Sequence, residues 1–160
     1  MWNKIKPYVI FIAVPLAAGG LSAWVTRGNM DIYEEINKPP LSPPGFLFPI
    51  VWGILYVLMG IGAGIVYSKR SETPVSAGAS LKLFGLQLIV NFFWSIIFFN
   101  MRAYLFAFIW LLLLWFLIIA MMLSFKTTSR SAAWLQLPYL LWVTFAGYLT
   151  IMVYILNRAL

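Results

Sequence analysis

Five long apolar stretches, separated by short polar segments, constrain this chain more than any other feature of its sequence. They cover approximately residues 7–26, 46–67, 81–99, 104–125 and 132–156. A helix of about 20 apolar residues crosses the hydrocarbon core of a bilayer. Because 63% of the residues are hydrophobic and only 9% are charged, little sequence remains for a water-soluble domain. The sequence therefore predicts an all-α integral membrane protein, a five-transmembrane-helix bundle that forms a single domain over residues 1–160.

One long polar segment, residues 27–44, separates the first and second apolar stretches. It contains three of the four acidic residues and ends in two Pro-Pro pairs. Proline fixes φ and lacks a backbone donor, so we expect an ordered or semi-rigid loop instead of a regular helix. This loop should lead into a helix that starts near Gly45 or Phe46.

The first apolar stretch, which follows Lys4 and Lys6, fits either a cleaved signal peptide or a retained membrane helix. Its length is sufficient to span a bilayer, and Trp24 near its end is typical of an interfacial anchor. We therefore expect a retained helix.

Basic residues are divided unequally between the two sides of a five-span bundle. The side of the N-terminus carries seven of them, Lys4, Lys6, Lys69, Arg70, Lys82, Lys126 and Arg130. The other side carries four, Arg27, Lys38, Arg102 and Arg158. Because cytoplasmic segments are enriched in Lys and Arg, the sequence predicts a cytoplasmic N-terminus and a C-terminus outside. The net charge of +7 is then explained by Lys and Arg residues that flank the helices and contact lipid headgroups. We therefore expect no nucleic-acid partner.

The residue types needed for ordinary catalysis or metal binding are scarce. The chain has no Cys and no His, which removes thiolate chemistry, imidazole ligands and the commonest general base. Its four acids, Asp31, Glu34, Glu35 and Glu72, all fall in expected loops. A proton-coupled pump needs an ionisable group inside the membrane, so a pump is not expected. We assign no catalytic residue and no metal site.

Small residues form a stripe on the second apolar stretch. Gly53, Gly60 and Gly64 lie on nearly one helical face, and Gly60 and Gly64 form a GxxxG pair. Such residues let two helix backbones approach closely. The stripe fits either packing inside the bundle or the seam of a homodimer.

Polar and aromatic residues share one face of the third stretch, at the spacing of a helix: Gln87, Asn91, Trp94, Ser95 and Phe98. Amides in hydrocarbon need partners, so this face should point into the bundle. It fits helix–helix hydrogen bonding or a ligand cavity with a few polar groups among aromatic walls. Trp52, Trp94, Trp110 and Trp142 lie too deep for interfacial anchors and suit either a planar hydrophobic ligand or simple core filling.

Three blocks of the sequence resemble the TspO/MBR family, which includes tryptophan-rich sensory proteins and the translocator protein, or peripheral-type benzodiazepine receptor. The first is Lys38–Gly60, KPPLSPPGFLFPIVWGILYVLMG. The second is Gln87–Phe99, with its Asn91, Trp94 and Ser95, and the third is Pro138–Ala146, PYLLWVTFA. The three blocks follow one another in the family's order, and the resemblance extends over nearly the whole chain.

The resemblance implies a five-helix bundle, often dimeric, with a ligand pocket under the long first loop. Members bind porphyrins, sterols and benzodiazepine-type or isoquinoline ligands. Carried over by position, the ligand-binding residues would be Tyr33, Pro43, Trp52, Asn91, Trp94, Trp110, Trp142 and Ala146. Ala146 would leave room for a bulky ligand.

Some positions depart from the family pattern. Leu41 stands where several relatives have Trp, and Ile109 where relatives often have an acid. Leu149, Tyr154 and Arg158 satisfy the loose sterol motif of animal members, but such patterns are weak. Because bacterial membranes generally lack cholesterol, and we expect a bacterial cell membrane, sterols are not expected ligands.

These features lead to one functional hypothesis and two alternatives. The hypothesis is a homodimeric membrane receptor or binding protein for porphyrin-type tetrapyrroles, haem-type ones included, which transports or senses them and needs no obligatory cofactor. Its partners would be membrane lipids and hydrophobic small molecules. The alternatives are oxidative or light-dependent porphyrin breakdown, with tryptophans as redox partners, and a scaffold whose cavity holds only lipid.

Overall fold

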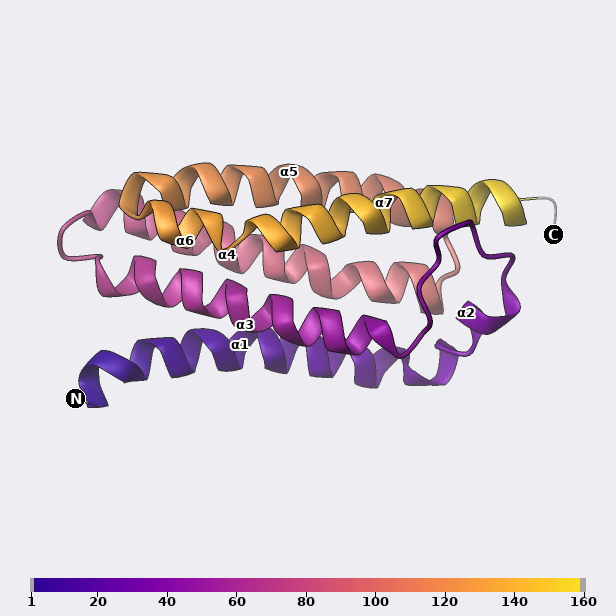
Figure 1. The fold of residues 1–160 in the computed structure, drawn as a ribbon, viewed down its shortest axis with the longest axis horizontal. Coiled ribbons are helices and arrows are strands. Elements are labelled where there is room, and N and C mark those ends of the chain that lie inside the picture. The colour runs from indigo at the N-terminus through magenta and orange to yellow at the C-terminus, as the bar shows by residue number, and fades with distance from the viewer. Residues whose placement is uncertain (1, 159–160) are drawn as a thin grey trace.

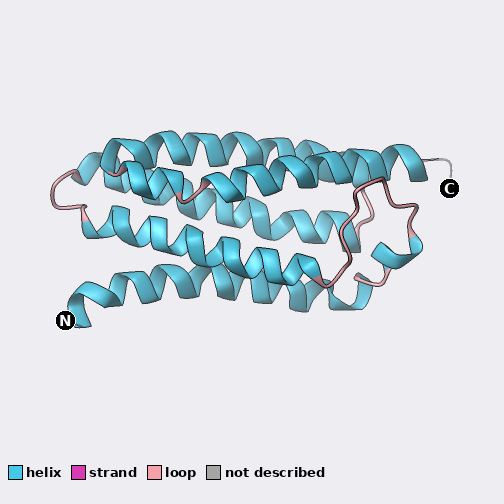
Figure 2. Cartoon of the chain, viewed as in Figure 1, coloured by secondary structure: helices cyan, strands magenta, loops and turns pink. Residues whose placement is uncertain are grey.

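Five apolar helices run along one long axis in the computed structural model, which describes residues 2–158 (Figure 1). They are α1 (Trp2–Thr26), α3 (Leu47–Ser68), α4 (Pro74–Ser95), α5 (Tyr104–Thr128) and α7 (Leu137–Asn157). Each is long and apolar enough, with its flanking turns, to cross a membrane. The predicted five-helix membrane bundle is confirmed, and the described part of the chain contains helices and loops only (Figure 2).

Shorter helical elements connect or extend the long ones. They are η1 (Arg27–Asn29), α2 (Ile32–Glu35), the π-helical η2 (Ile96–Asn100) and α6 (Arg130–Trp134). The expected loop 27–44 is therefore helical in its first half, where there is no proline, and consists of turns and irregular segments from Ile36 to Pro44. This segment lies at the same end of the bundle as the end of α7, opposite the start of α1 (Figure 1).

Two helices begin earlier than the expected ranges. The first begins at Trp2 instead of residue 7, and the third begins at Pro74 instead of residue 81. Pro74 occupies the first helical turn, where its missing N–H costs no hydrogen bond. Pro74, which was expected in a linker, is therefore the first residue of α4. At its other end, α4 is continued by η2 to Asn100.

The last span, expected as one helix over 132–156, is interrupted. Helix α6 ends at Trp134, and α7 begins at Leu137 with Pro138 in its first turn. Inside a continuous helix the proline ring would clash with the carbonyl four residues earlier. The break at Leu135 and Gln136 places Pro138 where that clash does not arise.

Two of the three glycines in the α3 stripe, Gly60 and Gly64, pack against α1, whereas Gly53 has no neighbour this close. A Cβ atom on Gly60 would lie 2.5 Å from the Phe11 carbonyl oxygen and closer still to the Ile12 Cα. A Cβ on Gly64 would lie 2.8 Å from the Tyr8 ring. Of the two interpretations of the GxxxG pair, packing inside the bundle is correct, because α1 occupies this surface.

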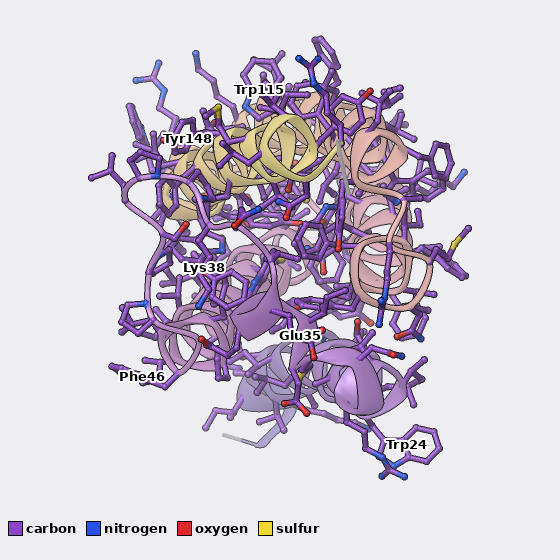
Figure 3. All side chains as sticks on the ribbon, turned by 90° about the vertical axis from the view of Figure 1, so that its right-hand side faces the viewer. Trp24, Glu35, Lys38, Phe46, Trp115 and Tyr148 are labelled. Atoms are coloured by element: carbon purple, nitrogen blue, oxygen red, sulfur yellow. The ribbon has the colours of Figure 1, made fainter. Side chains whose placement is uncertain are left out.

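The outer face of the bundle is apolar, as a lipid-facing surface requires. Large side chains such as Phe116, Leu123 and Ile109 on α5 are more than half exposed. Trp24, near the end of α1, points away from the bundle with Arg27 4.9 Å from its ring centroid (Figure 3). Its position suits the predicted interfacial anchor.

Candidate functional site

A buried hydrogen-bonded network ties three helices together at the centre of the bundle. The Tyr56 hydroxyl on α3 donates to Asn91 Oδ1 on α4 at 3.0 Å. Asn91 Nδ2 donates to the Tyr139 hydroxyl on α7 at 2.9 Å, and that hydroxyl donates to Gln87 Oε1 at 2.8 Å. The polar face of α4 therefore points into the bundle, as predicted. Both the oxygen and the nitrogen of the Asn91 amide have protein partners.

Trp52 lies directly against this network. Its ring stacks on Tyr56 at 5.5 Å between centroids and meets Tyr139 edge-on at 6.1 Å. One face of the Trp52 indole is thus covered by protein. Tyr56 and Tyr139 were absent from the expected site residues, although Tyr56 lies one helical turn after Trp52.

A chain of aromatic contacts leads from the first loop to α7. Tyr33 in α2 meets Phe48 edge-on at 5.2 Å, and Phe48 meets Trp142 at 5.9 Å. Trp142 in turn contacts Phe145 at 5.7 Å. Phe48 was not predicted, but it lies on the same face of α3 as Trp52, four residues earlier. The loop and two helices are joined here by ring contacts, which favour edge-to-face geometry.

Tyr33 and Pro43, the two loop residues expected at the site, contact each other. The Tyr33 hydroxyl donates to the Pro43 carbonyl at 2.8 Å. Burial raises the pKa of Tyr33 above its usual value, so the hydroxyl stays protonated to a higher pH than that of an exposed tyrosine. Lys38 Nζ lies 4.9 Å from the Tyr33 ring centroid and pairs with Glu34 at 2.6 Å.

The loop is also fastened to α7. The Tyr148 hydroxyl donates to the Pro40 carbonyl at 3.0 Å. Asn157 Oδ1 accepts from the Asn37 N–H at 2.9 Å, and its Nδ2 donates to the Asn37 carbonyl at 3.1 Å. Figure 3 shows the bundle from this end, with Lys38 of the loop and Tyr148 of α7 labelled. The loop therefore covers the end of the bundle as an ordered segment.

A groove of about 430 Å³ lies between α3 and α7, below this loop. Its lining is apolar and aromatic: Val51, Ile54, Leu55, Pro138, Leu141, Trp142 and Phe145. Ile54 and Leu141 are more than half exposed, so the groove opens on the outer, lipid-facing surface. Of the expected site residues, Trp142 is the one that lines it.

The indole N–H of Trp142 is buried and has no hydrogen-bond acceptor within the described protein. The N–H of Trp94 is in the same state. An unpaired buried donor costs about 1–3 kcal/mol, so an acceptor supplied by a ligand would relieve that cost. Asn91, the residue expected to offer a hydrogen bond, is instead occupied by Tyr56 and Tyr139.

The remaining expected residues lie on other parts of the core. Trp94 stacks on Phe98 at 5.4 Å. Trp110 donates its indole N–H to the Val90 carbonyl at 2.8 Å, which joins α5 to α4. Ala146 is buried on α7. The structure thus brings Tyr33, Pro43 and Trp142 to one cluster and Trp52 and Asn91 to another, and Trp110 joins two helices.

The comparisons with known proteins agree with the membrane fold. A family model described as "TspO/MBR family" matches residues 11–156. The chain is 39% identical to "Tryptophan-rich protein TspO" of Chlorobaculum tepidum over 159 residues, which are 98% of this chain and 99% of that protein. It is 35% identical to "Translocator protein" of Bos taurus over 144 residues, or 89% and 85% of the two chains. Identity to "Tryptophan-rich sensory protein" of Cereibacter sphaeroides is 33% over 135 residues, or 82% and 81%.

Proposed function

Because the chain belongs to the TspO/MBR family, we propose that it is a membrane receptor that binds porphyrin-type tetrapyrroles and similar hydrophobic ligands and transports or senses them. The names of its relatives include the words translocator and sensory, which supports this class of function. The observation that carries the proposal is the position of Trp142. This half-buried indole lines an apolar groove that opens toward lipid, and its N–H has no acceptor in the described protein.

The chemistry of the groove suits a flat, hydrophobic ligand with a polar edge. The aromatic faces of Trp142 and Phe145 offer stacking surfaces, and Val51, Leu55 and Pro138 offer apolar contact. Because this N–H is buried, the Trp142 indole would have to turn it toward the groove; a carboxylate or carbonyl on the ligand would then accept it and remove the cost of leaving it unpaired. Such a ligand already resides in the bilayer and would reach the groove from the side, between α3 and α7.

The loop is connected to one wall of this site, although none of its residues lines the groove. Tyr33 reaches Trp142 through Phe48, and hydrogen bonds from Tyr148 and Asn157 hold the loop on α7. A ligand in the groove would contact an aromatic wall whose side chains are already ordered before the ligand binds. Pre-ordered contacts cost less entropy on binding.

Titration of the purified protein with protoporphyrin IX in the dark, followed by tryptophan fluorescence, tests the proposal. We expect saturable quenching, and we expect Trp142→Phe to weaken binding roughly tenfold, because the variant loses stacking area and the N–H donor. Trp134→Phe is the matched control, since Trp134 is exposed on α6 and lies outside the groove. It should bind as the wild type does.

Two outcomes would contradict the proposal. Quenching that never saturates, and is equal in both variants and the wild type, would show partitioning of the porphyrin into micelles. A scaffold with a lipid-filled groove would then be the better interpretation. Repeating the titration under light and oxygen tests the other alternative. If less than one equivalent of protein converted porphyrin to a product faster than light bleaches it without protein, the protein would be shown to break porphyrin down.

We further propose a homodimer in a bacterial cell membrane, with a cytoplasmic N-terminus. Basic residues at the end of the bundle opposite the first loop, such as Lys4, Lys69 and Arg70, support this orientation. The dimer surface would lie away from Gly60 and Gly64, because α1 covers these glycines. Cross-linking in native membranes tests the dimer.

A further inference from the structure

A second groove lies at the loop end of the bundle, between the first turns of α5 and the last turns of α7. It has a volume of about 540 Å³ and is separate in its lining from the groove at Trp142. Its walls include two guanidinium groups and a series of apolar or aromatic side chains: Arg102, Leu105, Phe106, Ile109, Tyr154 and Arg158. The proposed receptor function makes no use of this groove.

The two arginines give the groove a positive charge that no acidic side chain among the described residues pairs with. No acidic residue lines it. Among the side chains that the structure describes, neither Arg102 nor Arg158 takes part in an ion pair. Both arginines are exposed and lie next to the ends of their apolar helices, where we expect lipid headgroups. Guanidinium groups bind phosphate oxygens in a two-pronged geometry.

Backbone hydrogen bonds define the turn that positions Arg102 directly before α5. The turn is fixed by the Met101 N–H, which donates to the Ile96 carbonyl, and the Ala103 N–H, which donates to the Ile97 carbonyl. Arg102 itself has a φ of 52°, which is uncommon for a residue other than glycine. Directly after it begins the 25-residue helix α5, whose N-terminus carries a partial positive charge.

The rest of the groove suits a hydrocarbon chain. Leu105, Phe106 and Ile109 lie on the first turns of α5, and each is between 42% and 54% exposed. These side chains continue from the arginines toward the middle of the most hydropathic span of the bundle. A molecule with a phosphate at one end and an acyl chain at the other would place each part against matching chemistry.

We propose that this groove binds an anionic phospholipid, with its phosphate between Arg102 and Arg158 and one acyl chain along Leu105, Phe106 and Ile109. A neutral sterol would leave both guanidinium groups unused. A zwitterionic phospholipid carries a second, positive group that would oppose them. The net negative headgroup is therefore the form that the groove selects.

Native mass spectrometry of the detergent-purified protein, titrated with dioleoylphosphatidylglycerol or dioleoylphosphatidylcholine, tests the proposal. We expect dioleoylphosphatidylglycerol to bind more tightly than dioleoylphosphatidylcholine. The double variant Arg102→Gln/Arg158→Gln should lose about tenfold or more in affinity for the anionic lipid, because each basic residue near an anionic lipid contributes to binding by a similar amount. Ile109→Trp keeps both charges but fills the groove, and it should weaken binding as well. Lys4→Gln/Lys6→Gln is the matched control, because it removes two exposed charges from the opposite end of the bundle.

Thermal unfolding of each variant would establish that it is folded before it is titrated. The proposal is supported if both groove variants lose affinity and the Lys4/Lys6 variant keeps it. Equal affinity for the two lipids would overturn it, as would undiminished binding by the double arginine variant. An equal loss in the Lys4/Lys6 variant would show general charge attraction, and full affinity in Ile109→Trp would place the lipid elsewhere.

Discussion

Replacing Gly60 with alanine is expected to lower the free energy of unfolding by about 2–3 kcal/mol, near the upper end of the cost of overpacking a core. The new Cβ would meet the backbone of α1 at Phe11 and Ile12, and backbone cannot rotate away as a side chain can. Helix α1 would have to move off α3 along its length. Reversible unfolding in mixed micelles, followed by circular dichroism, measures the change.

Gly53→Ala is the control for this experiment, because Gly53 lies on the same helix and a Cβ there would meet nothing within 4 Å. Alanine is a better helix former than glycine, so this variant should be as stable as the wild type or more stable by about 0.5–1 kcal/mol. If Gly60→Ala proved as stable as Gly53→Ala, the close packing of α1 on α3 would be wrong.

Removing the hydroxyl of Tyr139 is expected to cost about 2 kcal/mol of stability or more. The Phe variant keeps the ring but leaves Gln87 Oε1 without its donor and Asn91 Nδ2 without its acceptor, both deep in the bundle. Each buried group left unpaired costs about 1–3 kcal/mol, with smaller values found for some membrane proteins. The same unfolding measurement applies.

Two further variants separate the network from a general effect of losing a hydroxyl. Tyr148→Phe, on the same helix, removes an exposed bond to the Pro40 carbonyl and should cost less than about 1 kcal/mol. Adding Gln87→Leu to Tyr139→Phe removes the stranded acceptor and should recover part of the loss. Equal stability of Tyr139→Phe and Tyr148→Phe would show that the network contributes nothing.

The fold was largely predictable because membrane crossing depends on length and composition. Five apolar stretches gave five helices, and the polar face with Gln87 and Asn91 pointed inward as its spacing indicated. Helix boundaries near prolines were predicted wrongly, because a proline can stand either at the start of a helix or after its end. Pro74 begins α4, and Pro138 accompanies a break that the continuous apolar pattern did not reveal.

The site was less predictable, because it depends on which helices meet. Periodicity showed that Asn91 needed partners, but only the bundle shows that Tyr56 and Tyr139 supply them. The glycine stripe fitted two kinds of packing equally well, and the position of α1 decided between them. The groove at Trp142 lies between α3 and α7, and this contact between distant segments is not encoded by any local sequence pattern.

The structural features form a consistent basis for ligand binding. Close packing of α1 on α3 and the polar network make the bundle rigid, while the fastened loop and Phe48 hold Trp142 at the wall of a groove that faces lipid. A rigid wall with an unpaired N–H favours a flat ligand with an acceptor at its edge.

The most direct test of this account is a structure of the wild-type protein crystallised with protoporphyrin IX in the dark. The account predicts the macrocycle in the groove between α3 and α7, in van der Waals contact with the Trp142 indole and with an oxygen accepting its N–H. A macrocycle bound elsewhere, with lipid in that groove and the Trp142 N–H still without an acceptor, would contradict it.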